Sequence, residues 1–456
     1  MTAIPSSAQK LATKFNTPQI LRSGWYATWG ISLLMLIISI YGVNAQRQAL
    51  KTVGKDAAPS ILTAQQLQDS FADMDASLAN ELLLKPGANR QVLADFETNR
   101  KKIADRLVAA ARNITYPEEE RIIQGLQLNN SAYLLKLQSA REAHKRGDLA
   151  GALNIYQSAA TLMDRDIIPQ AEQLGRVNSQ ELEKSYTRQR FTNGGIGLAI
   201  AIVGLIQIAI LVIMQIFIYQ RMRRVLNLPL LGATAIAIVI LGYTISSFVG
   251  ATANLKVAKA DAFDSLYALR QMRSLSYKAN ADESRYLLDR ANSPKHEQSF
   301  NDKVAKILTI PPNLSIENVI LNTSLDIKSG EVTGLFTNAL NNITFNGERK
   351  LAIETLRSFN DYLKIDKQIR QLYRSGKVAE AIALCVGTNP GESNWAFDRY
   401  KNLHTELMEL NKKEFEKNIK LGNNRVENFE IYTTAALGSI AILTLFGVRP
   451  RLLEYL

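Results

Sequence analysis

Two clusters of charged and amide side chains interrupt otherwise amphipathic helical patterns, after the first and the third of four long apolar segments. Arginine offers planar donors to a carboxylate, Asp and Glu accept from an ammonium group, and Tyr adds apolar area with a hydroxyl. The clusters are therefore candidates for binding a polar ligand or a protein partner; the alternative is that they form the solvated side of two helices. The first comprises Asp73, Asp75, Asn80 and Glu81, and the second comprises Arg270, Arg273, Tyr277, Asn280, Asp282, Glu283, Arg285, Tyr286 and Asp289.

Catalytic signatures are not found in the sequence. His144, His296 and His404 are scattered and lack His or Cys neighbours at metal-ligand spacing, so neither a metal site nor a cofactor is predicted. A phosphate-cradling Gly loop, a Gly-x-Ser-x-Gly elbow and a kinase signature are likewise missing. Cys385 is the single cysteine, which excludes an intramolecular disulfide and favours a buried thiol over a reactive one. We therefore predict a protein that is not an enzyme.

Four apolar segments reach the roughly 20 residues that a helix needs to cross a bilayer. They are predicted as transmembrane helices at residues 25–44, 195–219, 226–249 and 431–448. We interpret the first as a retained anchor, because it is too long for an ordinary signal-peptide core and lacks a convincing cleavage site. The second contains Gln207 and Gln215 on roughly one face, where hydrogen bonding to a neighbouring span is favoured over a conduction pathway.

Basic residues near the spans set the expected orientation, because short cytoplasmic segments are enriched in Lys and Arg. The tail at 1–24, the link at 220–225 and the tail at 449–456 are basic, so both termini are predicted to be cytoplasmic. Residues 45–194 and 250–430 then form two extracytoplasmic domains of a bacterial inner-membrane protein. Much of the net charge of +12 lies on the cytoplasmic segments, so nucleic-acid binding is not predicted. Arg221, Arg223 and Arg224 of the link are candidates for contacting a cytoplasmic partner, with fixing of topology as the alternative role.

The chain resembles itself at an offset of 229 residues. Residues 113–156 align without a gap to residues 342–385, with ten identities in forty-four positions. The motif Asn113-Ile114-Thr115-Tyr116 pairs with Asn342-Ile343-Thr344-Phe345, and Gly147 pairs with Gly376. We therefore predict two duplicated units, each built as a span, an outer domain and a span.

Each outer domain has the pattern of a helical bundle. In the first, an apolar stripe predicts one buried helical face, and Gly147 and Gly376 mark tight turns between helices. Few Gly or Pro residues separate the outer helices from the spans, so we expect continuous helical rods, including an unbroken passage into the fourth span. The second domain carries an insertion around 309–341, either a solvated loop or a partner-binding surface. The predicted fold class is all-α. The stripe comprises Leu62, Leu67, Phe71, Met74, Leu78 and Leu82.

The segments Leu67–Ala76 and Ala279–Asp289 resemble a group of four-span membrane proteins of actinobacteria and cyanobacteria. One actinobacterial member of that group is linked to a solute-binding lipoprotein for acidic amino acids and to a soluble serine/threonine kinase of the G type. The resemblance implies a relay in which the binding protein detects an amino acid outside and the kinase responds inside.

These observations predict a non-enzymatic membrane sensor-transmitter that passes an extracytoplasmic signal to a separate cytoplasmic effector. Its expected partners are the lipid bilayer, a solute-binding protein outside and a kinase inside, and the chain could form a homo-oligomer. The alternatives are a structural or assembly scaffold of an envelope complex and an accessory subunit of a transporter.

Overall fold

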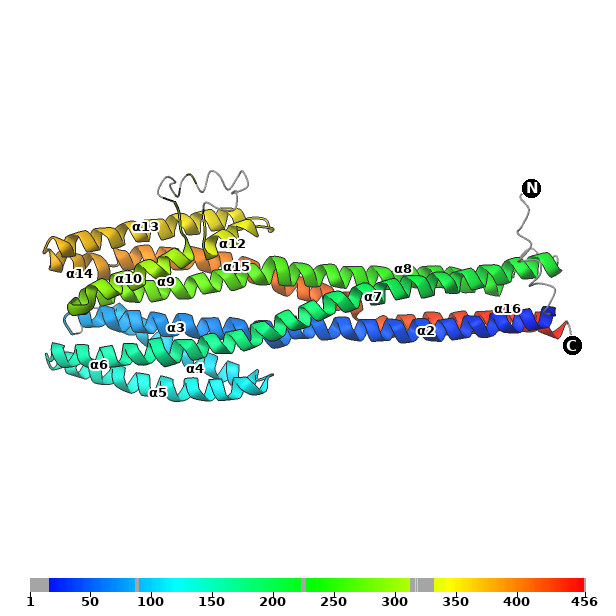
Figure 1. Cartoon of the computed structure of the whole chain (residues 1–456), viewed down its shortest axis with the longest axis horizontal. Helices are drawn as coiled ribbons and strands as arrows, with labels where there is room; N and C mark the ends of the chain where they lie inside the picture. The colour runs from blue at the N-terminus through cyan, green and yellow to red at the C-terminus, as the bar shows by residue number, and fades with distance from the viewer. Residues whose placement is uncertain are drawn as a thin grey trace. The chain divides into compact units, whose positions relative to one another are not determined.

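The computed structural model describes residues 16–86, 90–222, 227–311, 316, 318 and 332–454, and these residues are almost entirely helical (Figure 1). Within them no strand occurs, and a single antiparallel bridge joins Thr309 to Thr333. The predicted all-α fold class is confirmed. The chain divides into two compact units, one formed by Met1–Lys51, Lys184–Leu255 and Ile419–Leu456 and the other by Thr52–Glu183 and Lys256–Asn418.

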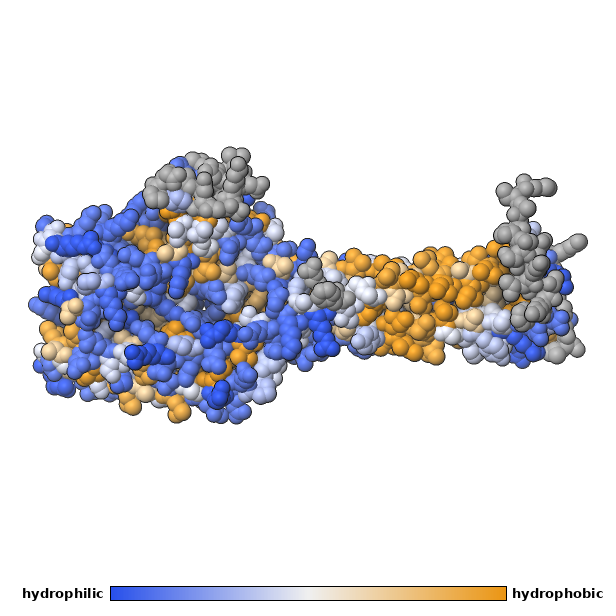
Figure 2. All heavy atoms as spheres, viewed as in Figure 1, coloured by the Kyte–Doolittle hydropathy of each residue, from blue (hydrophilic) through white to orange (hydrophobic). Residues whose placement is uncertain are grey.

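The first unit contains four helices that are long and apolar enough to cross a membrane, as predicted. They belong to α2 (Thr17–Lys51), α7 (Ile168–Met222), α8 (Leu228–Lys256) and α16 (Phe429–Leu453). Figure 2 shows their outer surface as a band of apolar residues, and large aliphatic side chains such as Leu205 (61%) and Val239 (70%) are exposed there. Exposed apolar side chains at this density are typical of a lipid-facing surface.

Polar side chains inside this unit bond from helix to helix. The amide of Gln207 donates to the Ser32 hydroxyl at 2.8 Å, and the amide of Gln215 donates to the Thr234 hydroxyl at 2.6 Å. Both glutamines therefore hydrogen-bond a neighbouring apolar helix, which confirms the packing interpretation.

The second unit is built from two similar series of helices. The first series contains η1 (Thr52–Ala57), α3 (Ala58–Leu83), α4 (Arg90–Arg112), α5 (Pro117–Lys145), α6 (Leu149–Leu162), η2 (Met163–Ile167) and the first part of α7. The second contains η3 (Val257–Phe263), α9 (Asp264–Leu288), η4 (Arg290–Asn292), α10 (Ser293–Ile307), α12 (Leu335–Asn341), α13 (Glu348–Arg374), α14 (Val378–Val386) and α15 (Ser393–Val426). Each series has its own apolar core, and α3 packs against α9.

Helix continuity agrees with the sequence prediction at three of the four spans. Helix runs unbroken from Thr17 to Leu83, from Leu149 to Met222 and from Leu228 to Leu288. The expected unbroken passage into the fourth span is wrong, because α15 ends at Val426 and α16 begins at Phe429. Between them Asn428 adopts a left-handed conformation with φ 55°, which Asn tolerates better than most residues and which interrupts the helical hydrogen bonds.

The Asn of each Asn-Ile-Thr motif binds a π-helical turn. The side-chain amide of Asn113 donates to a backbone carbonyl of η1 at 3.1 Å and to the Ser60 hydroxyl at 2.7 Å. The amide of Asn342 donates to two backbone carbonyls of η3 at 3.0 Å and to the Ser265 hydroxyl at 2.7 Å. A π-helical turn disturbs the regular helical hydrogen bonds, and these amides supply partners for its carbonyls.

The helix that follows each motif begins with the same carboxylate arrangement. Glu119 accepts from two backbone N–H groups before α5, at 2.6 and 2.8 Å, and Glu348 accepts from two before α13, at 2.9 and 3.1 Å. Their second oxygens accept from the amides of Asn178 at 2.6 Å and Asn411 at 2.8 Å, respectively. In each series a buried glutamate therefore caps the start of the helix.

Both glycines predicted to form tight turns do so. Gly147 has φ 83° and Gly376 has φ 79°, a left-handed conformation that favours glycine after the end of a helix. The predicted apolar stripe on α3 is also buried except at Leu62, which is partly buried, and Leu67, Phe71 and Leu78 are fully inaccessible. The insertion at 309–341 lies largely outside the described residues, so its predicted role as a loop or binding surface stays a prediction.

We predict that Asn113→Ala and Asn342→Ala each lower the thermal stability of the detergent-solubilised chain. Each change leaves carbonyls of a π-helical turn without their side-chain donor, at a cost of about 1–3 kcal/mol. The measurement is the unfolding midpoint by scanning fluorimetry. Gln371→Ala, at an exposed position of α13, is the matched control and leaves the midpoint almost unchanged. Equal midpoints for all three variants would contradict this assignment.

Candidate functional site

The structure brings the two predicted polar clusters together. Asp73, Asp75, Asn80 and Glu81 lie on α3, the members from Arg270 to Tyr286 lie on α9, and Asp289 directly follows α9. Most of these side chains are buried, with Asp75, Asp282 and Glu283 each only 1% exposed. Asp73, Glu81 and Arg273 are partly buried. The alternative of a solvated helix face is therefore wrong for the buried members.

Arg285 is the centre of an ionic network between the two series of helices. Its guanidinium donates to the Asp75 carboxylate at 2.6 Å and to the Asp282 carboxylate at 3.4 Å. Asp75 also accepts from the hydroxyls of Tyr133 at 3.0 Å and Tyr156 at 3.3 Å. Burial raises the pKa of Asp75, while Arg285 opposes this shift. The network links α9 to α3, α5 and α6 through charged and hydroxyl groups.

Glu283 occupies a second buried environment beside α14 and α15. Its carboxylate accepts from the Ser393 hydroxyl at 2.6 Å and from the Cys385 thiol at 3.5 Å. Burial raises the pKa of Glu283 to about 8, with the Asp366 carboxylate as a further cause, and Ser393 and Arg370 oppose the shift. Burial also raises the pKa of the Cys385 thiol, so the single cysteine is the buried, unreactive thiol expected from the sequence.

The ends of α3 and α9 carry further cross-contacts. The Ser284 hydroxyl donates to the Asn80 side-chain oxygen at 2.6 Å, and Arg141 forms an ion pair with Glu81 at 2.6 Å. At the corresponding end of α9, the guanidinium of Arg370 lies 4.5 Å from the centre of the Tyr286 ring. These contacts explain most of the predicted residues as parts of a buried interface.

Arg270 and Arg273 belong to a small charged cleft of about 180 Å³ between α3, α4, α9 and α15. We call it the arginine cleft. Asp69 faces both guanidiniums at 3.7 and 3.6 Å, which is longer than a direct hydrogen bond. Burial raises the pKa of Asp69, against the effect of the arginines. Its charged lining residues include Asp69, Asp73, Lys102, Arg106, Arg270 and Arg273.

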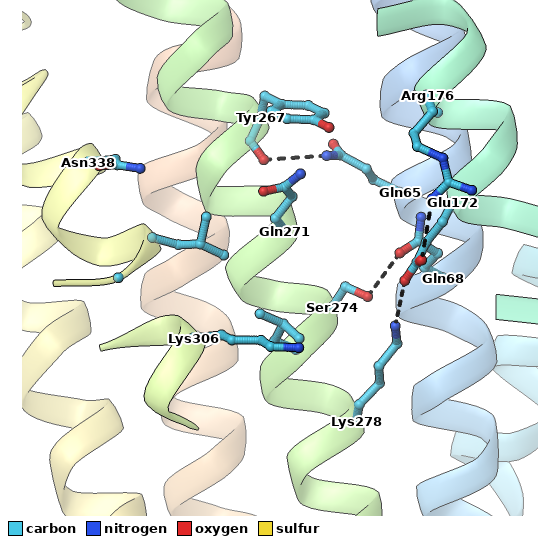
Figure 3. Close-up of a pocket in the computed structure, with 14 residues that line it drawn as sticks. Gln65, Gln68, Glu172, Arg176, Tyr267, Gln271, Ser274, Lys278, Lys306 and Asn338 are labelled. Carbon is cyan, nitrogen blue, oxygen red and sulfur yellow. Dashed lines mark hydrogen bonds and ion pairs between the residues drawn. The ribbon is translucent and has the colours of Figure 1, made fainter. Parts of the chain in front are cut away.

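A larger cleft of about 650 Å³ lies between α3, α7, α9, α10 and α12 (Figure 3). We call it the amide cleft. The Ser274 hydroxyl donates to the Gln68 side-chain oxygen at 3.2 Å, and Lys278 forms an ion pair with Glu172 at 3.1 Å. The Gln65 amide donates to a backbone carbonyl at 3.3 Å. Its main polar lining residues are Gln65, Gln68, Glu172, Gln271, Ser274 and Lys278.

Several residues of both clefts were not predicted as site residues, notably Asp69, Lys102 and Arg106 in the arginine cleft. Their exposure and contacts depend on how α3, α4 and α9 pack, which the local sequence pattern does not specify. A separate internal comparison at an offset of 205 residues, 24 fewer than the offset of the Asn-Ile-Thr motifs, pairs the α3 and α9 residues of the two clefts with one another.

The predicted cytoplasmic contact residues are only partly described. Arg221 is exposed in the last turn of α7, whereas Arg223 and Arg224 lie outside the described residues. Across the described part of the chain, no group of three His, Cys, Asp or Glu side chains could hold a metal ion.

Residues 49–187 match the sequence profile of a family described as the actinobacterial sensor domain. The match covers fewer than half of the residues and extends from the end of α2 into α7. Neither a curated protein nor a solved structure matches the chain. The profile match indicates a sensing role, and together with the four apolar helices it is compatible with a membrane protein.

We predict that the stability of the chain falls as the pH rises from about 5 to about 8, and that Glu283→Gln reduces this fall. In the unfolded chain the pKa of Glu283 is near the ordinary glutamate value of 4.5, whereas burial raises its pKa to about 8 in the folded chain. The unfolded state therefore binds fewer protons within this window, so rising pH favours unfolding.

The measurement is the unfolding midpoint of the detergent-solubilised chain at pH values from 5 to 8.5. Glu380→Gln, at an exposed site on α14, is the control and retains the dependence of the wild-type chain. The same pH dependence in wild type and Glu283→Gln would show that Glu283 is ionised in the folded protein.

Proposed function

We propose that the chain is a non-enzymatic membrane sensor-transmitter that relays an extracytoplasmic signal to a separate cytoplasmic effector. The observation that carries the proposal is the interface of α3 and α9. Both helices are unbroken continuations of membrane-length apolar helices, and their facing sides hold buried charges and two clefts. A continuous helix can transmit a shift or rotation, which a flexible connection cannot. The match to a sensor family over residues 49–187 supports this role.

The proposed orientation places both termini and the 220–225 link in the cytoplasm of a bacterial cell, with the second unit outside. The basic residues of these segments support it. A separate cytoplasmic partner is proposed to read the signal, and Arg221, Arg223 and Arg224 of the link are proposed to contact it.

The proposed partners come from the resemblance of Leu67–Ala76 and Ala279–Asp289 to the four-span group. They are a solute-binding protein outside, which presents an amino acid, and a serine/threonine kinase inside. The buried location of Asp75 and Arg285 argues that these residues hold the sensor interface together rather than contact a partner directly.

We also propose that the two outer segments arose by duplication. The matched contacts of Asn113 with Asn342 and of Glu119 with Glu348 support this proposal, as do the matched turns at Gly147 and Gly376. A duplicated plan explains why one chain contains two equivalent helices, α3 and α9, that pack on each other.

Cysteine labelling tests the orientation. In a Cys385→Ser background, Ser131→Cys and Ser375→Cys are expected to react with a membrane-impermeant maleimide when only the extracytoplasmic side is accessible. Both native serines are exposed in the second unit. Glu454→Cys, which is exposed near the C-terminus, is expected to react only after the membrane is permeabilised. The reverse pattern would invert the topology.

Affinity capture from gently solubilised membranes tests the relay. The wild-type chain is expected to retain a solute-binding protein and a kinase. A variant with Lys at positions 221, 223 and 224 keeps the topogenic charge but loses the planar donors of Arg, so it is expected to lose the kinase. Arg451→Lys is the matched control. Recovery of envelope assembly machinery alone would support the scaffold alternative instead.

A further inference from the structure

The arginine cleft and the amide cleft occupy equivalent positions in the two series of helices. Residues of α3 and α9 that line them are related by a constant separation of 205 positions, and those of α7 and α15 by 233 positions. The α3–α9 pairs are Gln65 with Arg270, Gln66 with Gln271, Gln68 with Arg273, Asp69 with Ser274, Ser70 with Leu275 and Asp73 with Lys278. Glu172 pairs with Thr405, and Arg176 pairs with Glu409.

The chemistry of the two clefts differs at the central pairs. In the amide cleft, the central positions are occupied by Gln65 and Gln68 of α3. The equivalent positions of the arginine cleft are occupied by Arg270 and Arg273 of α9. The arginine cleft also receives Lys102 and Arg106 from α4. Two neutral amides in one cleft are thus replaced by two permanent cations in the other.

The cations of the arginine cleft outnumber its acids. Lys102, Arg106, Arg270 and Arg273 face the carboxylates of Asp69, Asp73 and Glu409, and Tyr277 of α9 adds a hydroxyl. The excess of positive charge matters because the side chain of Arg270 is only 8% exposed and a buried charge needs close polar partners. Lys401 of α15 also lies nearby, with its ammonium 5.6 Å from the centre of the Tyr277 ring, but its charge is paired with Asp398 at 2.7 Å.

The acids do not fully satisfy these cations. Among the described residues, the Nε of Arg270 is buried without a hydrogen-bond partner, and the same is true of one Asp69 oxygen. Asp69 lies beyond hydrogen-bond distance of both Arg270 and Arg273. Asp73 accepts from the Asn99 amide at 2.9 Å instead. Burial lowers the pKa of Lys102, Arg106 and Arg270, and neighbouring guanidiniums act in the same direction while nearby carboxylates oppose them.

Arg106 and Arg273 are held in place by other contacts. Arg106 donates to the Gln66 carbonyl at 2.7 Å, and it also contacts the Ser70 hydroxyl. Arg273 donates to the hydroxyls of Thr405 at 2.7 Å and Tyr277 at 2.9 Å. Both cations are therefore positioned before any ligand arrives, which lowers the entropic cost of binding.

We propose that the arginine cleft binds a small oxyanion, the carboxylate or phosphate group of a small solute, between Arg106, Arg270 and Arg273. Planar guanidiniums match the oxygens of both groups. The volume of about 180 Å³ admits a small anion and excludes a large ligand. The bound anion would contact residues of α3, α4, α9 and α15 together. This proposal rests on the sensing function for its biological role, whereas binding itself is measured separately on the purified chain.

Calorimetric titration of the full chain in detergent tests the proposal. Inorganic phosphate, acetate and succinate are titrated separately at constant ionic strength, with chloride as the reference. We expect saturable binding of phosphate or of a carboxylate, and the anion that saturates identifies the source of the oxyanion. If phosphate, acetate and succinate all bind no more tightly than chloride, the proposal is overturned, because the carboxylates of Asp69, Asp73 and Glu409 then suffice for the cations of the cleft.

The variant R270Q/R273Q converts the central pair into the residues of the amide cleft. It is expected to weaken oxyanion binding by about tenfold or more for each arginine, because charge-assisted hydrogen bonds are lost. The matched control is Arg176→Gln, which removes an exposed arginine of the amide cleft and leaves the affinity unchanged. Equal affinity in the double variant and the wild type overturns the assignment.

A gain of affinity keeps the test independent of folding defects. Asp69→Asn removes the carboxylate nearest to Arg270 and Arg273 while preserving its shape, so an oxyanion is expected to bind about tenfold more tightly. Misfolding would not strengthen binding. An affinity that stays constant or falls in the Asp69→Asn variant, with the unfolding midpoint preserved, overturns the proposed position of the anion. Failure of kinase capture in cells would contradict the relay without affecting these binding results.

Discussion

The ion pair between Arg285 and Asp75 is the interaction on which the second unit most depends. The Arg285 guanidinium and the Asp75 carboxylate are 2.6 Å apart and join the two series of helices. Arg285 is 7% exposed and Asp75 is 1% exposed. Removing one partner of a buried pair leaves an uncompensated charge and typically costs about 3–5 kcal/mol. Two tyrosine hydroxyls also bond Asp75, so the pair fixes the orientation of α5 and α6 relative to α3. The register of α3 on α9 is therefore specified by charge as well as by apolar packing.

The two series of helices share two local structural features. Each places an asparagine under a π-helical turn and a buried glutamate at the start of the following helix. One π-helical turn directly follows α2 and the other directly follows α8, where the chain enters the second unit. Such turns are often found at functional positions because they change the helical register locally.

The interior of the unit departs from this repetition where α3 and α9 meet. Asp75 and Asn280 are separated by the same 205 positions as the cleft pairs, yet only Asp75 can carry a charge, and it is the residue that binds Arg285. Likewise, Gln65 and Gln68 correspond to the two arginines of the smaller cleft. A symmetric pair of charged faces would place like charges opposite each other, which is unfavourable in a buried interface. The differences between the two helices avoid this repulsion, and they leave two arginines in the smaller cleft where the larger cleft holds two amides.

The sequence by itself determined the all-α class, the four apolar helices, the buried stripe of α3 and the turns at Gly147 and Gly376, because these follow from periodicity, length and local backbone preference. It also located Asp75, Glu283 and Arg285 as unusual residues. Only the tertiary structure decided that they are buried and that Arg285 pairs with Asp75 across 210 positions of sequence. Local patterns equally missed the break at Asn428 and the role of Asp69 and Arg106. Burial and pairing arise from which helix faces meet, and a pattern within one helix carries no information about the face of another.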